Sequence, residues 1–159
     1  MRMTIAAVGR LKAGPDRALV ERYVERATQA GRSQGLTLAL RELAEGRSAQ
    51  VAARMREEAD GLLAAVPADA ALVALDERGE NLSSTDFADR LAVLRDRGTR
   101  DLVFAIGGAD GLDPSLRQRA GLLLSFGRMT WPHQIVRLML AEQIYRAVTI
   151  LSGHPYHRA

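Results

Sequence analysis

Side chains that can exchange protons and bind oxygen atoms gather near the C-terminal end of the chain. The segment His154-Pro155-Tyr156-His157-Arg158 contains two of the three histidines and one of the three tyrosines. Histidine changes its charge near neutral pH, and arginine binds phosphate or carbonyl oxygens with a rigid fork of donors. This tail is therefore a candidate for proton transfer or for binding a polar substrate. Its His-x-x-His spacing does not indicate a metal site, because the chain has no cysteine and only one further histidine.

Three segments further upstream have the composition of ligand-binding turns. Gly107-Gly108-Ala109-Asp110-Gly111 follows an apolar run, and its glycines allow the backbone to approach a ligand closely. This turn matches neither the dinucleotide-binding nor the P-loop pattern, so a simple tight connection is the alternative. Phe126 to Trp131 contains the single tryptophan, which serves either as a core residue or as a platform for a ring. The third segment, Leu75-Asp76-Glu77-Arg78-Gly79, is typical of an acidic turn after a strand.

Apolar runs of strand type alternate with longer helical patterns along the chain. The patterns predict strands at residues 4–8, 36–40, 71–75 and 102–106 and helices at 15–31, 48–66, 83–98 and 132–151, with a short helix starting near 113. Pro132 suits the first turn of the last helix, while Gly153 and Pro155 end it. Ser83 or Ser84 is the expected N-cap of the preceding long helix.

Continuous apolar strands separated by helices indicate a parallel sheet that is covered on both faces. We therefore expect an α/β, Rossmann-like fold in a single domain that spans residues 1–159. In such sheets, ligands bind outside the carboxyl ends of the strands. The glycine turn and the acidic turn both follow predicted strands, so the sheet would bring them to the same edge.

The composition limits the classes of protein that the chain can represent. Its 159 residues are 47% hydrophobic and 26% charged, which suits one domain with a buried core. We find neither a signal peptide nor a membrane span, and we expect a cytoplasmic protein. The net charge is +3, the sequence pI is near 9.9, and Lys12 is the only lysine. This balance fits a phosphate-rich partner, although a GC-rich genome also explains it. The candidate residues for contact with such a partner are Arg10, Lys12, Arg17 and Arg22.

Taken together and in this order, the segments resemble those of a known family. The matching motifs are VGRLK at residues 8–12, LDERGENLSSTDFA at 75–88, FAIGGADGL at 104–112, MTWPHQIVRLMLAEQIYRA at 129–147 and HPYHR at 154–158. Over its whole length the chain resembles the bacterial large-subunit rRNA pseudouridine N3-methyltransferases of the SPOUT class, the RlmH family. Motifs of this length and order are far more specific than a short glycine pattern.

The resemblance implies a deep trefoil knot in the C-terminal half of the fold, a homodimer, and S-adenosylmethionine bound in the knot. Carried over by motif, the cofactor site consists of Leu75, Gly108, Phe126, Gly127, Arg128, Met129, Thr130 and Trp131. The chain departs from the family at Ser125-Phe126-Gly127, where members often have a serine-rich run. This departure weakens cofactor binding if a serine hydroxyl makes the contact, and is harmless if the backbone does.

The implied reaction transfers a methyl group to N3 of a pseudouridine in 23S rRNA, on assembled ribosomes. It requires alignment of the two reactants, stabilisation of the developing negative charge and removal of a proton. The resemblance assigns Tyr156, His157 and Arg158, from the tail of one subunit, to the target base in the site of the other. His133 and Arg137, one helical turn apart, are candidates to face the same pocket.

Several of these assignments have alternatives. Glu142 and Arg146 have the i, i+4 spacing of an ion pair, and a dimer interface would equally suit Arg137, Gln134 and Gln143. For the whole chain, one alternative is a non-enzymatic ribosome-binding or assembly factor, which needs no cofactor loop. Another is an α/β enzyme that binds a nucleotide phosphate at the glycine turn, although the chain lacks the P-loop lysine.

Overall fold

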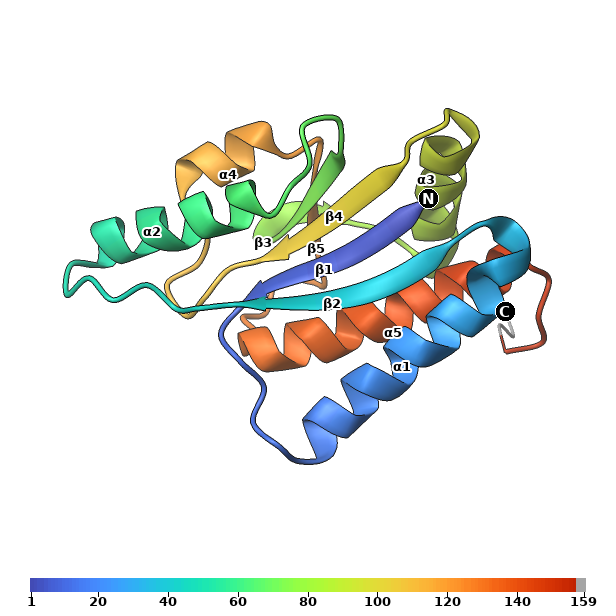
Figure 1. Cartoon of the computed structure of the whole chain (residues 1–159), viewed down its shortest axis with the longest axis horizontal. Coiled ribbons are helices and arrows are strands. Elements are labelled where there is room, and N and C mark those ends of the chain that lie inside the picture. Colours follow the sequence, from blue (N-terminus) through green and yellow to red (C-terminus); the bar gives the residue numbers. More distant parts are fainter. Residues whose placement is uncertain (157–159) are drawn as a thin grey trace.

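The fold was obtained as a computed structural model, which describes residues 1–156, and these residues form one sheet with helices around it (Figure 1). The strands are β1 (Arg2–Val8), β2 (Thr37–Leu43), β3 (Ala71–Asn81), β4 (Asp101–Ile106) and β5 (Leu122–Ser125). The helices are α1 (Pro15–Gly31), α2 (Val51–Ala64), α3 (Ser84–Asp96), α4 (Pro114–Arg119) and α5 (His133–Leu151), and a short 3₁₀ turn covers Arg32–Gln34. The strand order is β2-β1-β4-β3-β5, and every neighbouring pair is parallel. The predicted α/β fold with a parallel sheet is confirmed.

Helices cover both faces of the sheet. Figure 1 shows α1 and α5 side by side on one face, and α2 with α4 on the other. On the first face, Ile5 and Phe104 of the sheet belong to one buried cluster with Ile144 of α5. On the second, Ala105 lies in a separate cluster with Leu116 of α4. Because neighbouring residues of a strand point to opposite faces, the continuously apolar strands are buried on both sides.

A local sequence signal starts α3 where it was expected. The Ser83 hydroxyl accepts a hydrogen bond from the Asp86 N–H at 3.1 Å, and the Asp86 carboxylate accepts one from the Ser83 N–H at 3.3 Å. This reciprocal pair is a capping box, and it settles the choice between Ser83 and Ser84 as the N-cap of α3. Pro132, which was expected in the first turn of α5, is instead its N-cap, and the helix begins one residue later at His133.

Two features of the sheet were not predicted. β3 does not end at Leu75 but runs on to Asn81, through residues that were expected to form an acidic turn. The short strand β5, which pairs with β3, was also missed. Leu124 of β5 pairs with Leu75 and, after a shift of register, with Glu80. The extension of β3 is thus held by its neighbouring strand rather than by its own apolar pattern.

The boundaries of two other elements differ from the prediction. α2 was expected from residue 48 but begins at Val51. The Glu57 carboxylate accepts hydrogen bonds from the N–H groups of Arg47 and Ser48, which satisfies these donors outside the helix. β2 continues to Leu43 instead of ending at residue 40, because its whole length pairs with β1.

β3 and β5 approach each other closely in the C-terminal half of the described chain. A Cβ atom on Gly79 of β3 would lie 2.6 Å from the carbonyl carbon and oxygen of Leu123, so only glycine allows this approach of β3 to β5. From the edge strand β5 the chain then enters α5, which packs between α1 and α3. This path is compatible with the trefoil knot that the resemblance implies; the knot stays a prediction. Within residues 1–156, none of the helices has the length and apolar character to cross a membrane.

Candidate active site

A cavity of about 320 Å³ opens beside the middle of β3, where its register with β5 shifts, and at the carboxyl ends of β4 and β5. Its walls are residues 75–78 of β3, residues 106–112 after β4, and residues 124–126 and 129–131 at and after β5. His133 and Val136 of α5 complete the wall. The volume lies within the usual range for small-molecule sites. The fold therefore brings the three segments that the sequence singled out, which are far apart in the chain, to one cavity.

Most of the predicted cofactor residues line this cavity, namely Leu75, Gly108, Phe126, Met129, Thr130 and Trp131. Gly127 and Arg128 belong to the same loop but do not line it. Trp131 is 41% exposed and Met129 is 72% exposed, so the interpretation of Trp131 as a core residue is wrong. Exposed apolar side chains at the mouth of a cavity are available to cover a ligand.

Helix α2 supports the glycine turn from behind. A Cβ atom on Gly108 would lie 2.7 Å from Oε2 of Glu58, which is buried, so a larger residue at this position displaces the carboxylate or the turn. Arg54 of α2 forms an ion pair with Asp110 at 2.7 Å. Gly111 has a φ of +87° and donates its N–H to the Gly108 carbonyl at 3.2 Å, which closes the turn. The turn thus presents backbone to the cavity and is fixed by side chains outside it.

The loop after β5 is folded by a serine hydroxyl. The Ser125 hydroxyl donates to the Gly127 carbonyl at 2.9 Å and accepts from the Gly127 N–H at 3.1 Å. Ser125 is 5% exposed, and Gly127 has a φ of +113° that favours glycine. The single serine that this chain retains therefore shapes the loop, and its hydroxyl is occupied by these contacts.

Sequence reasoning missed a partly buried ion pair in the cavity wall. Asp76 was assigned only to an acidic turn, and Arg117 was not considered. The Asp76 side chain is 5% exposed, accepts the Arg78 N–H at 2.9 Å and pairs with the Arg117 Nε atom at 2.8 Å. Both residues line the cavity. The position of Asp76 directly after an apolar strand was the available signal, whereas the partner on α4 becomes apparent only in three dimensions.

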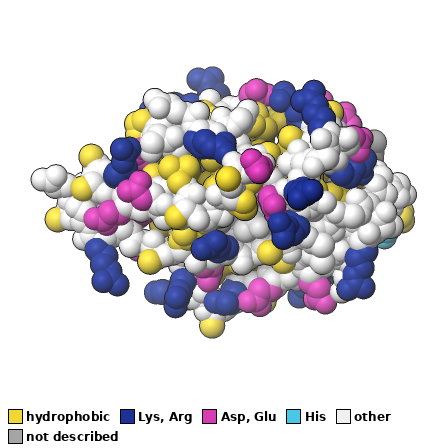
Figure 2. Space-filling view, turned by 45° about the horizontal axis from the view of Figure 1, so that its top comes forward, with side chains coloured by type: hydrophobic (Ala, Val, Ile, Leu, Met, Phe, Trp, Pro, Cys, Tyr) yellow, Lys and Arg dark blue, Asp and Glu magenta, His cyan; other side chains and the backbone are white. Residues whose placement is uncertain are grey.

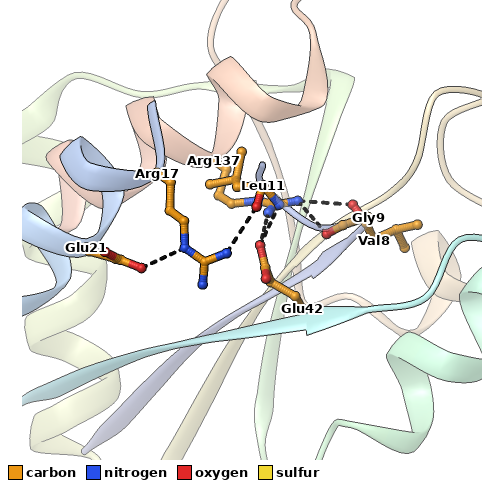
Figure 3. Close-up of polar contacts among 7 residues, drawn as sticks. All are labelled: Val8, Gly9, Leu11, Arg17, Glu21, Glu42 and Arg137. Carbon is orange, nitrogen blue, oxygen red and sulfur yellow. Dashed lines mark hydrogen bonds and ion pairs between the residues drawn. The ribbon is translucent and has the colours of Figure 1, made fainter. Parts of the chain in front are cut away.

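His133 and Arg137 do not face the same pocket. His133 lines the cavity, as expected, but Arg137 is 0% exposed and points toward β1 and β2 (Figure 3). Arg137 donates to the Glu42 carboxylate at 2.8 Å and to the carbonyls of Val8 and Gly9 at 3.0 and 3.1 Å. Burial lowers the pKa of Arg137, and the paired carboxylate opposes this shift. Both expectations for Arg137, a place in the pocket and a place in a dimer interface, are therefore wrong.

The predicted tail residue Tyr156 packs at the other end of α5. Its ring centroid lies 4.6 Å from that of Tyr145, and its hydroxyl donates to Glu142 at 3.2 Å. Burial, together with neighbouring Tyr23 and Glu142, raises the pKa of Tyr156 to about 12. The expected ion pair between Glu142 and Arg146 is confirmed at 2.7 Å. His157 and Arg158 lie outside the described residues, so their assignments stay predictions.

Comparisons with known proteins define the class to which this fold and cavity belong. Residues 1–157 match the family described as "Predicted SPOUT methyltransferase". The chain is a methyltransferase of this class. It is 58% identical over 160 residues to a protein of Rhizobium meliloti and 56% identical over 160 residues to proteins of Allorhizobium ampelinum and Mesorhizobium japonicum, with 100% of each chain covered. All three are named ribosomal RNA large subunit methyltransferase H.

The chain therefore belongs to the RlmH family of SPOUT methyltransferases. This finding confirms the resemblance drawn from the sequence motifs. It favours an enzyme over a non-enzymatic ribosome-binding factor, and a methyl donor over a nucleotide phosphate as the ligand of the cavity.

Proposed function

We propose that this protein uses S-adenosylmethionine to methylate N3 of a pseudouridine in large-subunit (23S) rRNA on assembled ribosomes. The observation that carries the proposal is that residues 75–78 of β3, the glycine turn and the loop before α5 line one cavity. The names of the relatives, which specify the RNA of the large ribosomal subunit, support the choice of substrate. The chain acts as one domain, in the cytoplasm.

The residues around the cavity suit a bound S-adenosylmethionine. Leu75 and Met129 provide apolar contact for a ring, and the turn at Gly108 provides backbone donors and acceptors. In the loop before α5, Phe126, Thr130 and Trp131 cover the ligand. Gly127 and Arg128 do not line the cavity and maintain the conformation of the loop. The cofactor supplies an electrophilic methyl group, and the protein aligns it with the acceptor nitrogen. In favourable cases such alignment alone lowers the activation free energy by roughly 7–11 kcal/mol.

The acceptor side of the reaction requires residues that bind the base and accept its proton. Among the described residues, His133 is the histidine that lines the cavity, beside the carboxylates of Asp76, Glu77 and Asp110. We propose that Tyr156, His157 and Arg158 contact the target base and its backbone. Arginine stabilises the negative charge that develops on the base oxygens, and histidine changes its protonation state near neutral pH.

A homodimer explains how the tail and the cavity meet. Tyr156 contacts Glu142 and Tyr145, while the cavity lies at the His133 end of the same helix. The rise of an α-helix, about 1.5 Å per residue, separates His133 from Tyr145 by roughly 18 Å. We therefore propose that the tail of one subunit completes the cavity of its partner.

A second cavity supports a partner on this face of the molecule. It has a volume of about 580 Å³, lies between α1, α3 and α5, and is lined by the half-buried side chains Leu19, Leu138 and Met139. Apolar side chains grouped at a surface suit contact with another protein chain, and a two-fold dimer is the commonest such arrangement. We place the dimer contact on this face.

The direct test is transfer of labelled methyl groups from S-adenosylmethionine to ribosomes that lack the modification. Free rRNA and ribosomes with uridine in place of pseudouridine serve as the comparison substrates. We expect label in large-subunit RNA only with assembled, pseudouridylated ribosomes. No transfer, together with no cofactor binding by calorimetry, would overturn the proposal.

A further inference from the structure

The segment between β1 and α1, residues 9–14, is fixed by a buried anchor although it belongs to neither element. Leu11 is 3% exposed, and both of its backbone polar groups are bound by side chains. Its N–H donates to Glu42 at 2.7 Å, and its carbonyl accepts from Arg17 at 3.0 Å (Figure 3). In surface loops the backbone N–H and carbonyl groups usually form hydrogen bonds with water. This segment is instead held in a single path.

Arg137 of α5 fastens the same segment from inside the protein. Its guanidinium binds the carbonyls of Val8 and Gly9, where β1 gives way to the loop, and the Glu42 carboxylate that also holds Leu11 (Figure 3). A buried charge of this kind is tolerated only when it is paired and hydrogen-bonded, as it is here. The loop is thereby tied to α5, the helix whose first turn lines the cofactor cavity.

The loop begins beside the cavity wall. Gly9 has a φ of +82°, and a Cβ atom on it would lie 3.5 Å from Nε2 of His133. His133 lines the cavity. Glu45, the carboxylate on the other side of Gly9, would lie 2.9 Å from the same Cβ atom. Residues that directly follow Gly9 therefore lie at the rim of the site where the methyl group is transferred.

Two cations flank the buried anchor. Arg10 and Lys12 are both exposed, and neither forms an ion pair with a residue in the described part of the chain. Arg17, by contrast, is already paired with Glu21 at 2.8 Å. On the face shown in Figure 2, lysine and arginine side chains are spread among acidic ones rather than gathered in one stripe. Several other arginines of the described residues also lack an ion pair, and one of them, Arg78, lines the cavity, so Arg10 and Lys12 are distinguished by their place on the anchored loop.

We propose that the segment from Arg10 to Lys12 is a preformed phosphate-binding loop for the RNA backbone beside the target base, with Glu42 and Arg137 as its positioning residues. The assignment rests on the proposed rRNA methyltransferase function and adds to it the part of the surface that holds the substrate. A rigid loop binds phosphate without the entropic cost of ordering, and it sets the distance from backbone to cavity. Arg17 and Arg22, the other candidates from the sequence, are not part of it.

The test measures the affinity of the full-length protein for ribosomes that lack the modification, at a series of salt concentrations. The double variant Arg10→Gln/Lys12→Gln removes both charges. It leaves the packing of the core unchanged, because both side chains are exposed. The affinity falls as salt rises, and each lost phosphate contact makes the slope of log affinity against log salt shallower by about 0.7 for single-stranded nucleic acid. For two lost contacts we therefore expect the magnitude of the slope to decrease by about 1.4. Binding of S-adenosylmethionine should not change.

The matched control is Arg97→Gln/Arg100→Gln. These two arginines are exposed and lie before β4, at the edge of the sheet opposite the cavity, so the control removes the same charge elsewhere. An equal slope for wild type and Arg10→Gln/Lys12→Gln, or an equal decrease in both double variants, would overturn the phosphate-binding loop. If the wild-type protein neither binds nor methylates ribosomes, the proposed function itself fails, and the loop assignment with it.

Discussion

The two ends of α5 are built in different ways. At the first turn, His133 lines the cavity, and the fully buried Arg137 ties the helix to β1 and β2 through three hydrogen bonds. At the last turns, Tyr156 rests on Tyr145 and Arg146 through ring contacts and reaches Glu142 by one hydrogen bond. The first end is fixed by buried charge, whereas the second is held by partly exposed contacts.

This difference indicates separate tasks for the two ends. A cavity that aligns a methyl donor requires fixed walls, because misplacement of the reacting atoms is costly. A tail that must reach a substrate in a second subunit requires contacts with its own subunit that are weak enough to break. In the proposed dimer, the same helix supplies a rigid wall to its own site and a tail to the partner's site, and variants that affect one end should leave the other intact.

The largest expected effect follows from removing the tail. Truncation after Ser152 deletes Tyr156 and the two residues proposed to act on the base, while the cavity residues remain. We expect methyl transfer to fall by roughly 10²–10⁴-fold, the range of a lost acid–base contribution, with little change in cofactor affinity. Single-turnover transfer and calorimetry measure the two quantities. Retained transfer would remove the tail from the reaction.

The next effect is on the rigid end. Arg137→Met leaves Glu42 and two backbone carbonyls without their donor, and breaking a buried ion pair of this kind costs about 3–5 kcal/mol. Urea unfolding measures the loss. Arg2→Met, which breaks the exposed pair with Asp101, is the control and should change stability far less. Equal losses in the two variants would contradict the role given to Arg137.

A smaller effect is expected behind the glycine turn. Gly108→Ala places a methyl group where Oε2 of Glu58 lies, so the turn or the carboxylate must move. We expect cofactor affinity to fall about fivefold, or ~1 kcal/mol, by calorimetry. Combining the change with Glu58→Ala should restore part of the affinity. In Gly121→Ala, the new Cβ atom meets only the Leu72 carbonyl at 3.7 Å, so this control should bind like wild type.

The smallest effect concerns the C-terminal end of α5, where Tyr156 packs. The pKa of Tyr156 is raised from 10.0 to about 12, so its neutral form is favoured by folding. This contribution to stability is complete below about pH 10 and is lost as the pH rises toward about 12. The melting temperature should therefore fall more steeply over this range in wild type than in Tyr156→Phe. Parallel curves would show that the hydroxyl is not held as described.

Much of the fold could be predicted from the sequence, because most elements carry their own pattern. Four strands are continuous apolar runs, and α3 and α5 have clear start signals in Ser83 and Pro132. β5 was missed because four residues provide too little pattern. The end of β3 was missed because its charged residues are typical of a turn, and only pairing with β5 holds them in the sheet.

The candidate site divides in the same way. The glycine turn and the loop before α5 were found because glycine, tryptophan and their place after strands are visible in the sequence. Arg137 was misassigned because its partner Glu42 is 95 residues away, and a charge within a helix gives no sign that it is buried. The same holds for Arg117 and Asp76, whose contact depends on α4 reaching back to β3.

The central claim, that the cavity and the tail of one site come from different subunits, is tested most directly by complementation. One variant lacks the residues after Ser152, and the other carries Leu75→Trp, which fills the cavity. We expect each variant to be inactive alone. Co-expressed at equal levels, random pairing gives mixed dimers with one complete site, so we predict about a quarter of wild-type methyl transfer to ribosomes. Mixed dimers that form but transfer no methyl groups would contradict the claim.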